Sequence, residues 1–503
     1  MIKNEKIDLA ILLLVSLILS TYLFFQTYVI SMDGAFQYIP MAKNFISGLF
    51  SKGLREYGQQ PLYPFLIAMV SHVVTDFELA GKLVSTLFGV LMIFPVYFLG
   101  KRIFDQKIAF LSTLVLVIHP YIRRFSADVL KESTYLFFLA TAFWFAWRTL
   151  EKEKRYLFLF IPLFSALAYL VRPDGVEILL VVFFYTLFVK KFSVSGKKGV
   201  VILLILLSSG ILFLPYLLHL KGVTGEWALS KAKSIGGILG TGVTSGEISL
   251  IHKILFSLKK LNLEILAVYH PLYIFLLLIG IGKRVFSHSK TGEGFLLSFC
   301  ILHYLILFLL VLNLTNWSVD ETREIFMFSG RHVLPLLLIS IYWVGEGFLT
   351  IYDWIFKKVE SQRLFLHLEL KRKSATVLVT LLILISAIVL PKTLKPQRYE
   401  RLPEKWSGIW IKNQSGQGAT IFTSLPRVAY YADGNSVSID SKRDTIDQIK
   451  TSMVEKGALY LVIEERDAVN FPEKTEAIKK NFIEVIRYKE KGTESVLIYK
   501  RIQ

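Results

Sequence analysis

The sequence predicts a polytopic α-helical membrane protein of about 11 transmembrane helices, followed by a small C-terminal extracytoplasmic α/β domain. Mean hydropathy is +0.52 and 53% of the 503 residues are hydrophobic, which is more than a soluble protein of this length carries on its largely polar surface. The apolar residues are also clustered, because runs near the length of a bilayer crossing recur along the first 391 residues. After Pro391 the pattern changes to that of a soluble domain.

Eleven apolar runs are candidate transmembrane helices. They are 8–30, 79–100, 108–122, 133–150, 157–171, 176–189, 200–219, 265–282, 295–314, 333–352 and 375–391. The first run is longer than the apolar core of a signal peptide and lacks a convincing small-residue cleavage site, so we expect it to be retained. An odd number of spans places the two termini on opposite sides of the membrane.

Loop charge predicts the orientation and explains the formal net charge of +19. With a cytoplasmic N terminus, the inner loops are 100–107, 147–155, 190–198, 282–290 and 357–373. Each is basic, as the positive-inside rule requires, so the net charge does not indicate a nucleic-acid partner. We expect a protein of the plasma (inner) membrane whose site faces the extracytoplasmic side. The single cysteine, Cys300, excludes an internal disulfide and a cysteine metal site.

The outer segments predict surface structure and a separate domain. Apolar residues at helical spacing in 35–50, and the short apolar stretch 61–74, predict interfacial helices in the first outer loop. A longer outer loop is expected at 220–264. Strand-like and helix-like stretches predict the α/β domain over 392–503, and the absence of a phosphate-binding or dinucleotide motif favours a domain that covers or supports the membrane site. The candidate strands are 419–424, 458–465, 482–488 and 495–501, and the candidate helices are 445–457 and 473–481.

Asp33 stands where the first apolar run ends, in "ISMDGAFQYIPMAKN" (30–44). As a structural residue it would cap the helix that follows, or be a solvated surface acid. As a functional residue it would be a carboxylate at the membrane interface, where a lower dielectric makes it a stronger base.

A second polar cluster lies in "RRFSADVLKESTYLFF" (123–138). If this stretch is helical, Arg124, Asp128 and Glu132 share one face, and the two acids repel unless a cation, a ligand or Arg124 compensates them. The alternatives are a solvated helix start with a local ion pair, or a pair of acids that positions a polar substrate or a divalent cation.

Cations at the outer span ends form a third group. Arg172 lies in the turn "VRPDG" (171–175), and Arg331 and His332 precede the tenth span. Each can contact lipid headgroups, or bind a phosphate group. Lys221, Lys231 and Lys233 add positive charge in the long outer loop, which suits a lipid phosphate.

These motifs together resemble the GT-C membrane glycosyltransferases, of the protein O-mannosyltransferase and lipid A aminoarabinose transferase type. The resemblance begins with the acid after the first span, "YIPMA" (38–42) and "QPLYPFL" (60–66). It continues in the same order through "SADVLKESTYLFF" (126–138), "VRPDG" (171–175) and "GRHVLPLLL" (330–338).

The resemblance implies a GT-C catalytic domain over 1–391 that moves a hexosyl or pentosyl group from a polyprenyl-phosphate donor, with inversion, to a lipid, glycan or protein acceptor. Asp33 occupies the family's acidic position and is assigned as the catalytic residue. Acceptor or sugar orientation is assigned to Asp128, Glu132, Gln37 and Tyr38, and lipid-phosphate binding to Arg172, Arg331 and His332. Family members often have a second acid where this chain has Gly34, which weakens a metal-based mechanism, so no cofactor is assigned although a divalent cation stays an option.

The alternative from another class is a transporter or flippase for a lipid-linked or polar substrate, and an assembly protein is the third option. Transporters place ionisable groups near the bilayer midplane and within internal repeats. In this sequence the apolar runs are almost free of charge and the polar groups gather at one face, which favours an interfacial enzyme.

Overall fold

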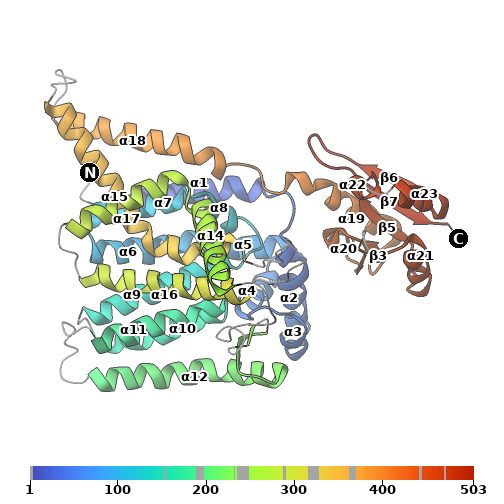
Figure 1. Cartoon of the computed structure of the whole chain (residues 1–503), viewed down its shortest axis with the longest axis horizontal. Helices are drawn as coiled ribbons and strands as arrows, with labels where there is room; N and C mark the ends of the chain where they lie inside the picture. Colours follow the sequence, from blue (N-terminus) through green and yellow to red (C-terminus); the bar gives the residue numbers. More distant parts are fainter. Residues whose placement is uncertain are drawn as a thin grey trace. The chain divides into compact units, whose positions relative to one another are not determined.

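The protein is described by a computed structural model, shown in Figure 1. The described residues are 4–151, 155–188, 198–231, 233–234, 249–286, 291–314, 328–361, 370–440, 444–469 and 472–502. They form two compact units, one of Met1–Tyr22 with Met41–Leu394 and the other of Leu23–Pro40 with Lys395–Gln503. The second unit begins at Lys395, near the predicted change after residue 391, but it also takes the segment after the first span, which the sequence assigned to the membrane domain.

The first unit is helical. Its α-helices are α1 (Glu5–Phe25), α2 (Ile39–Ile46), α3 (Phe50–Glu56), α4 (Leu62–Ser71), α5 (Phe77–Leu91), α6 (Ile93–Ile103), α7 (Gln106–Val117), α8 (Pro120–Ser126), α9 (Glu132–Leu150), α10 (Phe160–Tyr169), α11 (Glu177–Phe188), α12 (Lys198–Thr224), α14 (Leu250–Tyr269), α15 (Pro271–Phe286), α16 (Thr291–Leu314), α17 (Leu334–Ser361) and α18 (Leu370–Thr393). Short 3-10 helices are η2 (Arg155–Leu159), η3 (Pro173–Val176) and η4 (Gly330–His332), and β1 (Ala228–Ser230) pairs with β2 (Lys233–Ser234). In Figure 1 most of the long helices lie side by side.

Each of the eleven predicted apolar runs overlaps one or more of these helices. Six described helices are long and apolar enough to cross a membrane, and two bent pairs raise the number to eight; shorter apolar helices occur at Leu62–Ser71 and Leu157–Tyr169. The bends are 61° between α7 and α8 and 100° between α14 and α15. The number of about eleven crossings stays a prediction.

One sequence expectation about the outer segments needs correction. Much of the predicted loop 220–264 is helical, because α14 begins at Leu250; residues 235–248 lie outside the described part. Its three lysines, Lys253, Lys259 and Lys260, interrupt the apolar pattern of its first eleven residues, which is why the sequence predicted a loop there. The predicted interfacial stretches are helical as η1 (Gly34–Tyr38, a π-helix), α2, α3 and α4, and their position at a membrane surface stays a prediction.

Helix α17 forms the centre of the first unit, since every residue of its Leu334–Phe348 half is buried. It approaches α15 and α7 closely through glycines. A Cβ at Gly347 would lie 1.9 Å from the carbonyl oxygen of Leu276, and one at Gly345 would lie 2.1 Å from the hydroxyl of Ser112. Small residues that let helix backbones approach in this way are typical of membrane helix packing.

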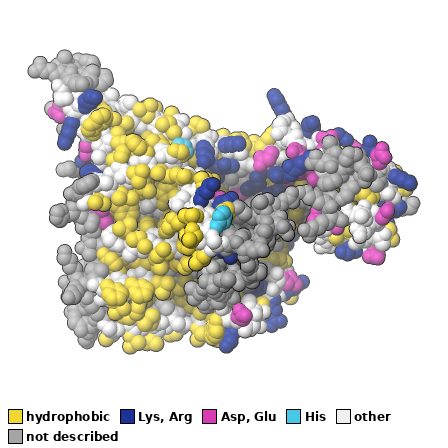
Figure 2. Space-filling view, viewed as in Figure 1, with side chains coloured by type: hydrophobic (Ala, Val, Ile, Leu, Met, Phe, Trp, Pro, Cys, Tyr) yellow, Lys and Arg dark blue, Asp and Glu magenta, His cyan; other side chains and the backbone are white. Residues whose placement is uncertain are grey.

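The outer helices of the same unit expose apolar side chains. Helices α12 and α18 have only 11% and 17% of their most apolar windows buried, and Figure 2 shows hydrophobic side chains over broad faces of the helical unit. A protein that exposed such a surface to water would aggregate, whereas lipid chains solvate the surface. The described helices therefore have the surface of an integral membrane protein.

The second unit contains a five-stranded sheet of order β4-β3-β5-β7-β6. Its strands are β3 (Thr420–Thr423), β4 (Asn435–Ser438), β5 (Tyr460–Glu464), β6 (Phe482–Tyr488) and β7 (Val496–Arg501), and its helices are η5 (Tyr399–Arg401), α19 (Leu402–Ser415), α20 (Pro426–Tyr431), α21 (Ile446–Glu455), α22 (Glu465–Val469) and α23 (Pro472–Asn481). Strand β3 pairs in parallel with β4 and β5, whereas β7 is antiparallel to β5 and β6. The four predicted strands and both predicted helices are present.

Alternating residues of the strands form two cores, one on each face of the sheet. Phe422, Leu461 and Leu497 pack with α21 and α23, and Ile421, Val462 and Ile498 pack with residues of α19 and α20. The sequence missed the short, mostly exposed strand β4 and the amphipathic helix α19, because neither has a strong apolar pattern.

Candidate functional site

The helix is interrupted between α8 and α9. This corrects the expectation that Arg124, Asp128 and Glu132 share one continuous helical face. Helix α8 ends at Ser126 and α9 starts at Glu132, so the two acids do not follow helical spacing. Both are buried, with 0% and 1% of their surfaces exposed. Asp128 accepts a hydrogen bond from the backbone N–H of Val129 (2.7 Å), and Glu132 occupies the first turn of α9.

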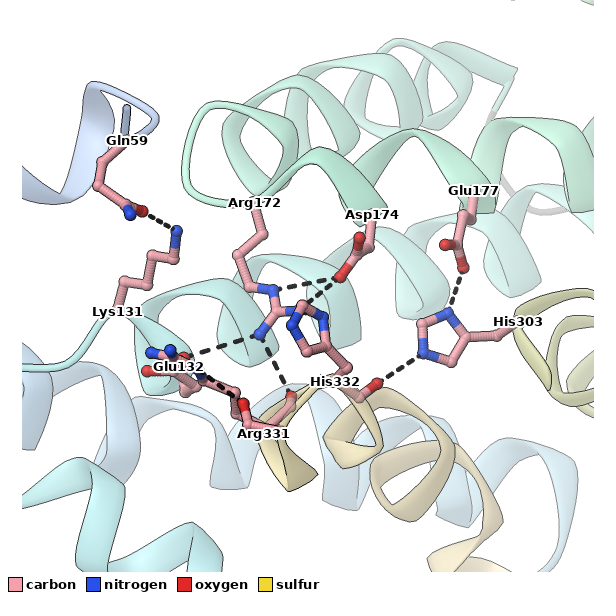
Figure 3. Close-up of polar contacts among 10 residues, drawn as sticks. Gln59, Lys131, Glu132, Arg172, Asp174, Glu177, His303, Arg331 and His332 are labelled. Carbon is pink, nitrogen blue, oxygen red and sulfur yellow. Dashed lines mark hydrogen bonds and ion pairs between the residues drawn. The ribbon is translucent and has the colours of Figure 1, made fainter. Parts of the chain in front are cut away.

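Arg172 is held in the turn between α10 and α11. Gly175 makes this turn possible, because a Cβ there would lie 2.2 Å from the backbone nitrogen of Tyr169. Only 4% of the Arg172 side chain is exposed, and the guanidinium lies over the ring of Tyr135 at 5.2 Å. Figure 3 shows that polar groups from several helices surround it.

The guanidinium of Arg172 directs its donors at protein acceptors. Nε and Nη2 donate to Oδ2 of Asp174 at 3.2 and 2.8 Å, and Nη1 donates to the carbonyl of Arg331 at 3.2 Å. Nη2 also lies 2.8 Å from Nδ1 of His332, which must be the acceptor because arginine has no acceptor atom. His332 is therefore neutral at Nδ1 in this arrangement, with its proton on Nε2.

The charges of this cluster stabilise one another. Burial alone would raise the pKa of Asp174, but the guanidinium of Arg172 holds that pKa well below its ordinary value. Burial likewise opposes the charge of Arg172, and Asp174 and Glu132 outweigh it and raise the pKa of the guanidinium. The turn thus contains a buried ion pair whose two charges stabilise each other.

Glu132 lies between two arginines without a hydrogen bond to either. Its Oε1 is 3.7 Å from Nη1 of Arg172 and 3.9 Å from Nη1 of Arg331. Neither carboxylate oxygen has a hydrogen-bond partner among the described residues, although both are buried. A buried carboxylate with this much unused acceptor capacity is costly and is typical of a site that receives a donor from a ligand or a water molecule.

Arg331 is the exposed cation of the cluster, with 34% of its side chain accessible. Its Nε donates to the hydroxyl of Ser329 at 3.0 Å, and η4 places it at the start of α17. Helix α16 supports this turn, because Nε2 of His303 donates to the carbonyl of His332 at 3.0 Å while Nδ1 faces the carboxyl of Glu177 (Figure 3).

Several residues of the cluster were missed by sequence reasoning. His303 and Glu177 are single polar residues within apolar runs, and Tyr135 stands in an aromatic-rich helix. Lys131 lies 2.5 Å from the side-chain oxygen of Gln59. A polar residue inside a predicted span is the only signal that the sequence offered for His303 and Glu177.

A lysine of the long outer loop also lies in this part of the first unit. Gln60, next to Gln59, donates to the carbonyl of Leu229 at 3.1 Å, and Lys231 is two residues further along the chain. The buried ammonium of Lys231 has no hydrogen-bond partner among the described residues, and burial lowers its pKa. Lys221 instead lies over the ring of Trp227, and the side chain of Lys233 lies outside the described part.

An apolar cavity of about 610 Å³ lies among α14, α15, α16 and α17. Its lining includes Leu266, Tyr269, Leu297, Leu336 and Ser340. Leu336 is five residues from Arg331, so the cavity begins close to the start of α17. Its shape and lining suit an apolar chain.

Asp33, Gln37 and Tyr38 belong to the second unit, with the segment Leu23–Pro40. Asp33 precedes η1 in right-handed helical geometry and makes no capping hydrogen bond to the helix, so its interpretation as a helix cap is wrong. Tyr38 is fully buried and Gln37 is partly exposed. The roles predicted for these three residues stay predictions.

Within the described residues, no group of three or more His, Cys, Asp or Glu side chains is arranged to hold a metal ion. The involvement of a divalent cation therefore stays a prediction.

The chain is similar in sequence or in structure to known proteins of the GT-C type. Residues 59–219 match the family described as dolichyl-phosphate-mannose-protein mannosyltransferase. ArnT from Cupriavidus metallidurans, bound to undecaprenyl phosphate, has a similar structure with a TM-score of 0.59 and 11% identity over 98% of each chain. Its apo form gives a TM-score of 0.60 and 12% identity over 97% of each chain.

The chain has the GT-C glycosyltransferase fold. The oligosaccharyltransferase of Archaeoglobus fulgidus in its apo form adds a TM-score of 0.61 at 12% identity, covering 99% of this chain and 75% of that one. These similarities confirm the fold class and the GT-C resemblance predicted from the sequence. No curated protein sequence matches.

The family match covers only part of the GT-C fold. Residues 59–219 include Gln59, Glu132 and Arg172, but neither Asp33 nor Arg331. Similarity at identities of 11–12% establishes the fold of this chain and leaves its substrates to be argued from its own residues.

Proposed function

We propose that the protein is a glycosyltransferase that moves a hexosyl or pentosyl group from a polyprenyl-phosphate donor to a lipid, glycan or protein acceptor. The observation that carries the proposal is the cluster of buried Arg172 and Glu132 with the accessible Arg331, at the ends of apolar helices in a GT-C fold. The family description and the lipid phosphate in the ArnT structure support this class of donor.

The donor phosphate is assigned to Arg331, assisted by Lys231. A phosphate leaving group requires positive charge, and Arg331 is the accessible guanidinium of the cluster, whereas the Nζ of Lys231 is a buried donor. Arg172 directs its donors at Asp174, His332 and the Arg331 carbonyl, which favours a role in positioning Arg331 over the direct phosphate contact that the sequence suggested. His332 accepts from Arg172 and belongs to the same support.

The acceptor is assigned to the carboxylates. Asp33 removes the proton from the acceptor hydroxyl or amine as the acceptor attacks the anomeric carbon. The bond from that carbon to the phosphate oxygen breaks, its electron pair remains on the phosphate, and the configuration inverts. Glu132 offers two unused acceptor oxygens for a hydroxyl or amine of the acceptor or sugar, and Asp128, Gln37 and Tyr38 are assigned to the same orientation.

The apolar cavity beside Leu336 is assigned to the first isoprene units of the donor. Lipid chains bind such surfaces through dispersion and area burial alone, which accounts for its lack of charged lining residues. We place the site on the extracytoplasmic face of a plasma (inner) membrane, with a cytoplasmic N terminus, because the loops predicted to lie inside are basic.

The test replaces Asp33 by Asn in the full-length protein. We expect glycosylated product in a complemented deletion strain, measured by mass spectrometry, to fall at least about 100-fold, since general-base contributions are of that size. Binding of undecaprenyl phosphate should not change. Asp76→Asn is the matched control, because Asp76 caps α5 and Asn caps equally well. Normal product in the Asp33 variant would refute the assignment.

A transporter or flippase remains the second candidate, because α14 and α15 form a helix pair broken by 100° at His270. Broken helices are typical of transporter binding sites. Proteoliposomes that contain the purified protein and a fluorescent polyprenyl phosphate discriminate the two functions. Movement of the lipid between leaflets without sugar transfer would favour transport.

A further inference from the structure

The segment that leads to Asp33 is bound to the C-terminal domain through its backbone. Thr27 and Gln397 form an isolated parallel bridge. The N–H of Gln397 donates to the carbonyl of Gln26 at 2.9 Å, and the N–H of Tyr28 donates to the carbonyl of Gln397 at 3.2 Å. The side-chain amide of Gln397 also donates to the hydroxyl of Thr27 at 3.0 Å. The chain is therefore fixed to the domain as soon as α1 ends.

Four side chains of the domain then bind the next three residues of the segment. They are Lys405 to the carbonyl of Tyr28 (3.1 Å), Arg398 to the carbonyl of Val29 (2.8 Å), Arg427 to the carbonyl of Ile30 (3.0 Å), and the hydroxyl of Tyr431, which accepts from the N–H of Ile30 (2.9 Å). Val29 and Ile30 are fully buried. Three successive residues thus have backbone polar groups satisfied by one domain, which requires the segment to follow a single path.

The contact from Arg427 is itself supported by ion pairs within the domain. Arg427 is paired with Glu404 at 3.2 Å, and Glu404, only 2% exposed, also accepts from Arg401 at 3.1 Å. Arg401 continues to Glu464 of β5 at 2.7 Å. The path from the sheet to Ile30 therefore runs through charge-assisted hydrogen bonds, which are stronger than neutral ones.

Asp33 follows Ile30 by three residues and lies in the turn that this anchor starts. The hydroxyl of Ser31 accepts from the N–H of Gly34 at 3.1 Å, and the carbonyl of Ser31 accepts from the N–H of Ala35 at 3.0 Å. Only two residues separate Ile30 from Asp33. A displacement of the Ile30 backbone would therefore also displace the carboxylate of Asp33. A displacement of about 1 Å in a reacting group is enough to cost about 100-fold in rate.

We propose that the C-terminal domain is a positioning element of the transferase, and that Tyr431 and Arg427 are positioning residues for Asp33. This inference rests on the role proposed for Asp33 above. The sequence predicted only that the domain covers or supports the membrane site. The proposal gives the domain a role in the reaction, because it holds the segment that carries Asp33.

The test uses the full-length protein with Tyr431→Phe, which removes only the hydroxyl that accepts from Ile30. Amide hydrogen exchange of the peptide that contains Ile30 should become about five- to tenfold faster, since one buried hydrogen bond is worth about 1 kcal/mol. Glycosylated product in the complemented deletion strain should fall about tenfold, whereas binding of undecaprenyl phosphate should not change. Tyr488→Phe in β6 is the matched control, because Tyr488 packs against the core of the same domain and, among the described residues, makes no hydrogen bond to the segment.

A tether provides the rescue that a general loss of stability would not show. Neighbouring strands lie about 4.8 Å apart, which a disulfide can span, so Thr27→Cys with Gln397→Cys can join the bridged pair. Added to Tyr431→Phe, the oxidised tether should restore product and slow exchange, and reduction should reverse both. The chain has one native cysteine, Cys300, which lies in α16, distant in sequence from both Thr27 and Gln397.

The outcomes separate the two proposals. Unchanged exchange, or unchanged product in Tyr431→Phe beside an inactive Asp33→Asn, would overturn the positioning role alone. Full activity of Asp33→Asn would overturn the proposed role of Asp33 and the positioning role with it.

Discussion

Replacement of Arg172 by Met tests whether the buried cluster at the α10–α11 turn supports the site. The substitution keeps the length of the apolar stem and removes a guanidinium that makes four polar contacts with Asp174, His332 and the Arg331 carbonyl. Removing one partner of a buried ion pair costs about 3–5 kcal/mol, because the remaining charge stays desolvated. With an unfolding entropy of about 2.1 cal/mol/K per residue, this lowers the Tm of the helical unit by roughly 5 °C.

The assay is thermal unfolding of the purified protein together with a binding isotherm for undecaprenyl phosphate. The dissociation constant should rise about tenfold, because Arg331 loses the hydrogen bond that holds its backbone. The double variant Arg172→Met with Asp174→Asn should recover part of the lost stability, since it no longer buries an unpaired carboxylate. Arg148→Met, at the partly exposed Arg148 over Trp144, is the control. A wild-type Tm in Arg172→Met, or additive losses in the double variant, would refute the reasoning.

Three further predictions follow from single contacts. Glu132→Gln removes the buried charge without changing the shape; we expect at least about tenfold less product, and unchanged product would exclude an orienting role. Because its pKa is depressed in the folded protein, ionised Asp174 stabilises the fold above the ordinary carboxyl pKa of about 3.9, and this stabilisation disappears as the pH falls through the lower folded value. Unfolding measured between pH 3 and 6 should therefore show a smaller acid loss for Asp174→Asn than for the wild type, and identical pH profiles would contradict the pairing. Gly347→Ala should destabilise α17 against α15 by about 1–3 kcal/mol or more, whereas Gly282→Ala, with no atom within 4 Å, should not; equal Tm values would contradict the close approach.

Local sequence patterns located most of the helices and strands of this protein. The apolar runs located the helices because a bilayer requires about twenty consecutive apolar residues, and the short continuous apolar run in "ALYLVIEE" (458–465) located a buried strand. The same reasoning failed at α14, whose lysines made a helix resemble a loop, and between α8 and α9, where a break removed the assumed helical face.

The site residues divide in the same way. Arg172, Arg331 and Glu132 were marked by the sequence as charged groups at span ends, which are rare enough to be noticed one at a time. The sequence did not mark their neighbours His303 and Glu177. These are isolated polar residues in apolar helices, and no local sequence pattern distinguishes them from buried structural residues.

The sequence by itself determined that this is a membrane protein with helical spans and a C-terminal α/β domain, and it predicted that the polar groups lie at one side of the membrane. The tertiary structure decided which of those groups meet. Arg172 contacts a carbonyl 159 residues away, and the segment before Asp33 is held by Arg427, 397 residues from Ile30. Hydropathy and charge act on neighbours within a helix or strand, whereas contacts at these separations depend on how whole elements pack, so the role of the C-terminal domain could be inferred only from the fold.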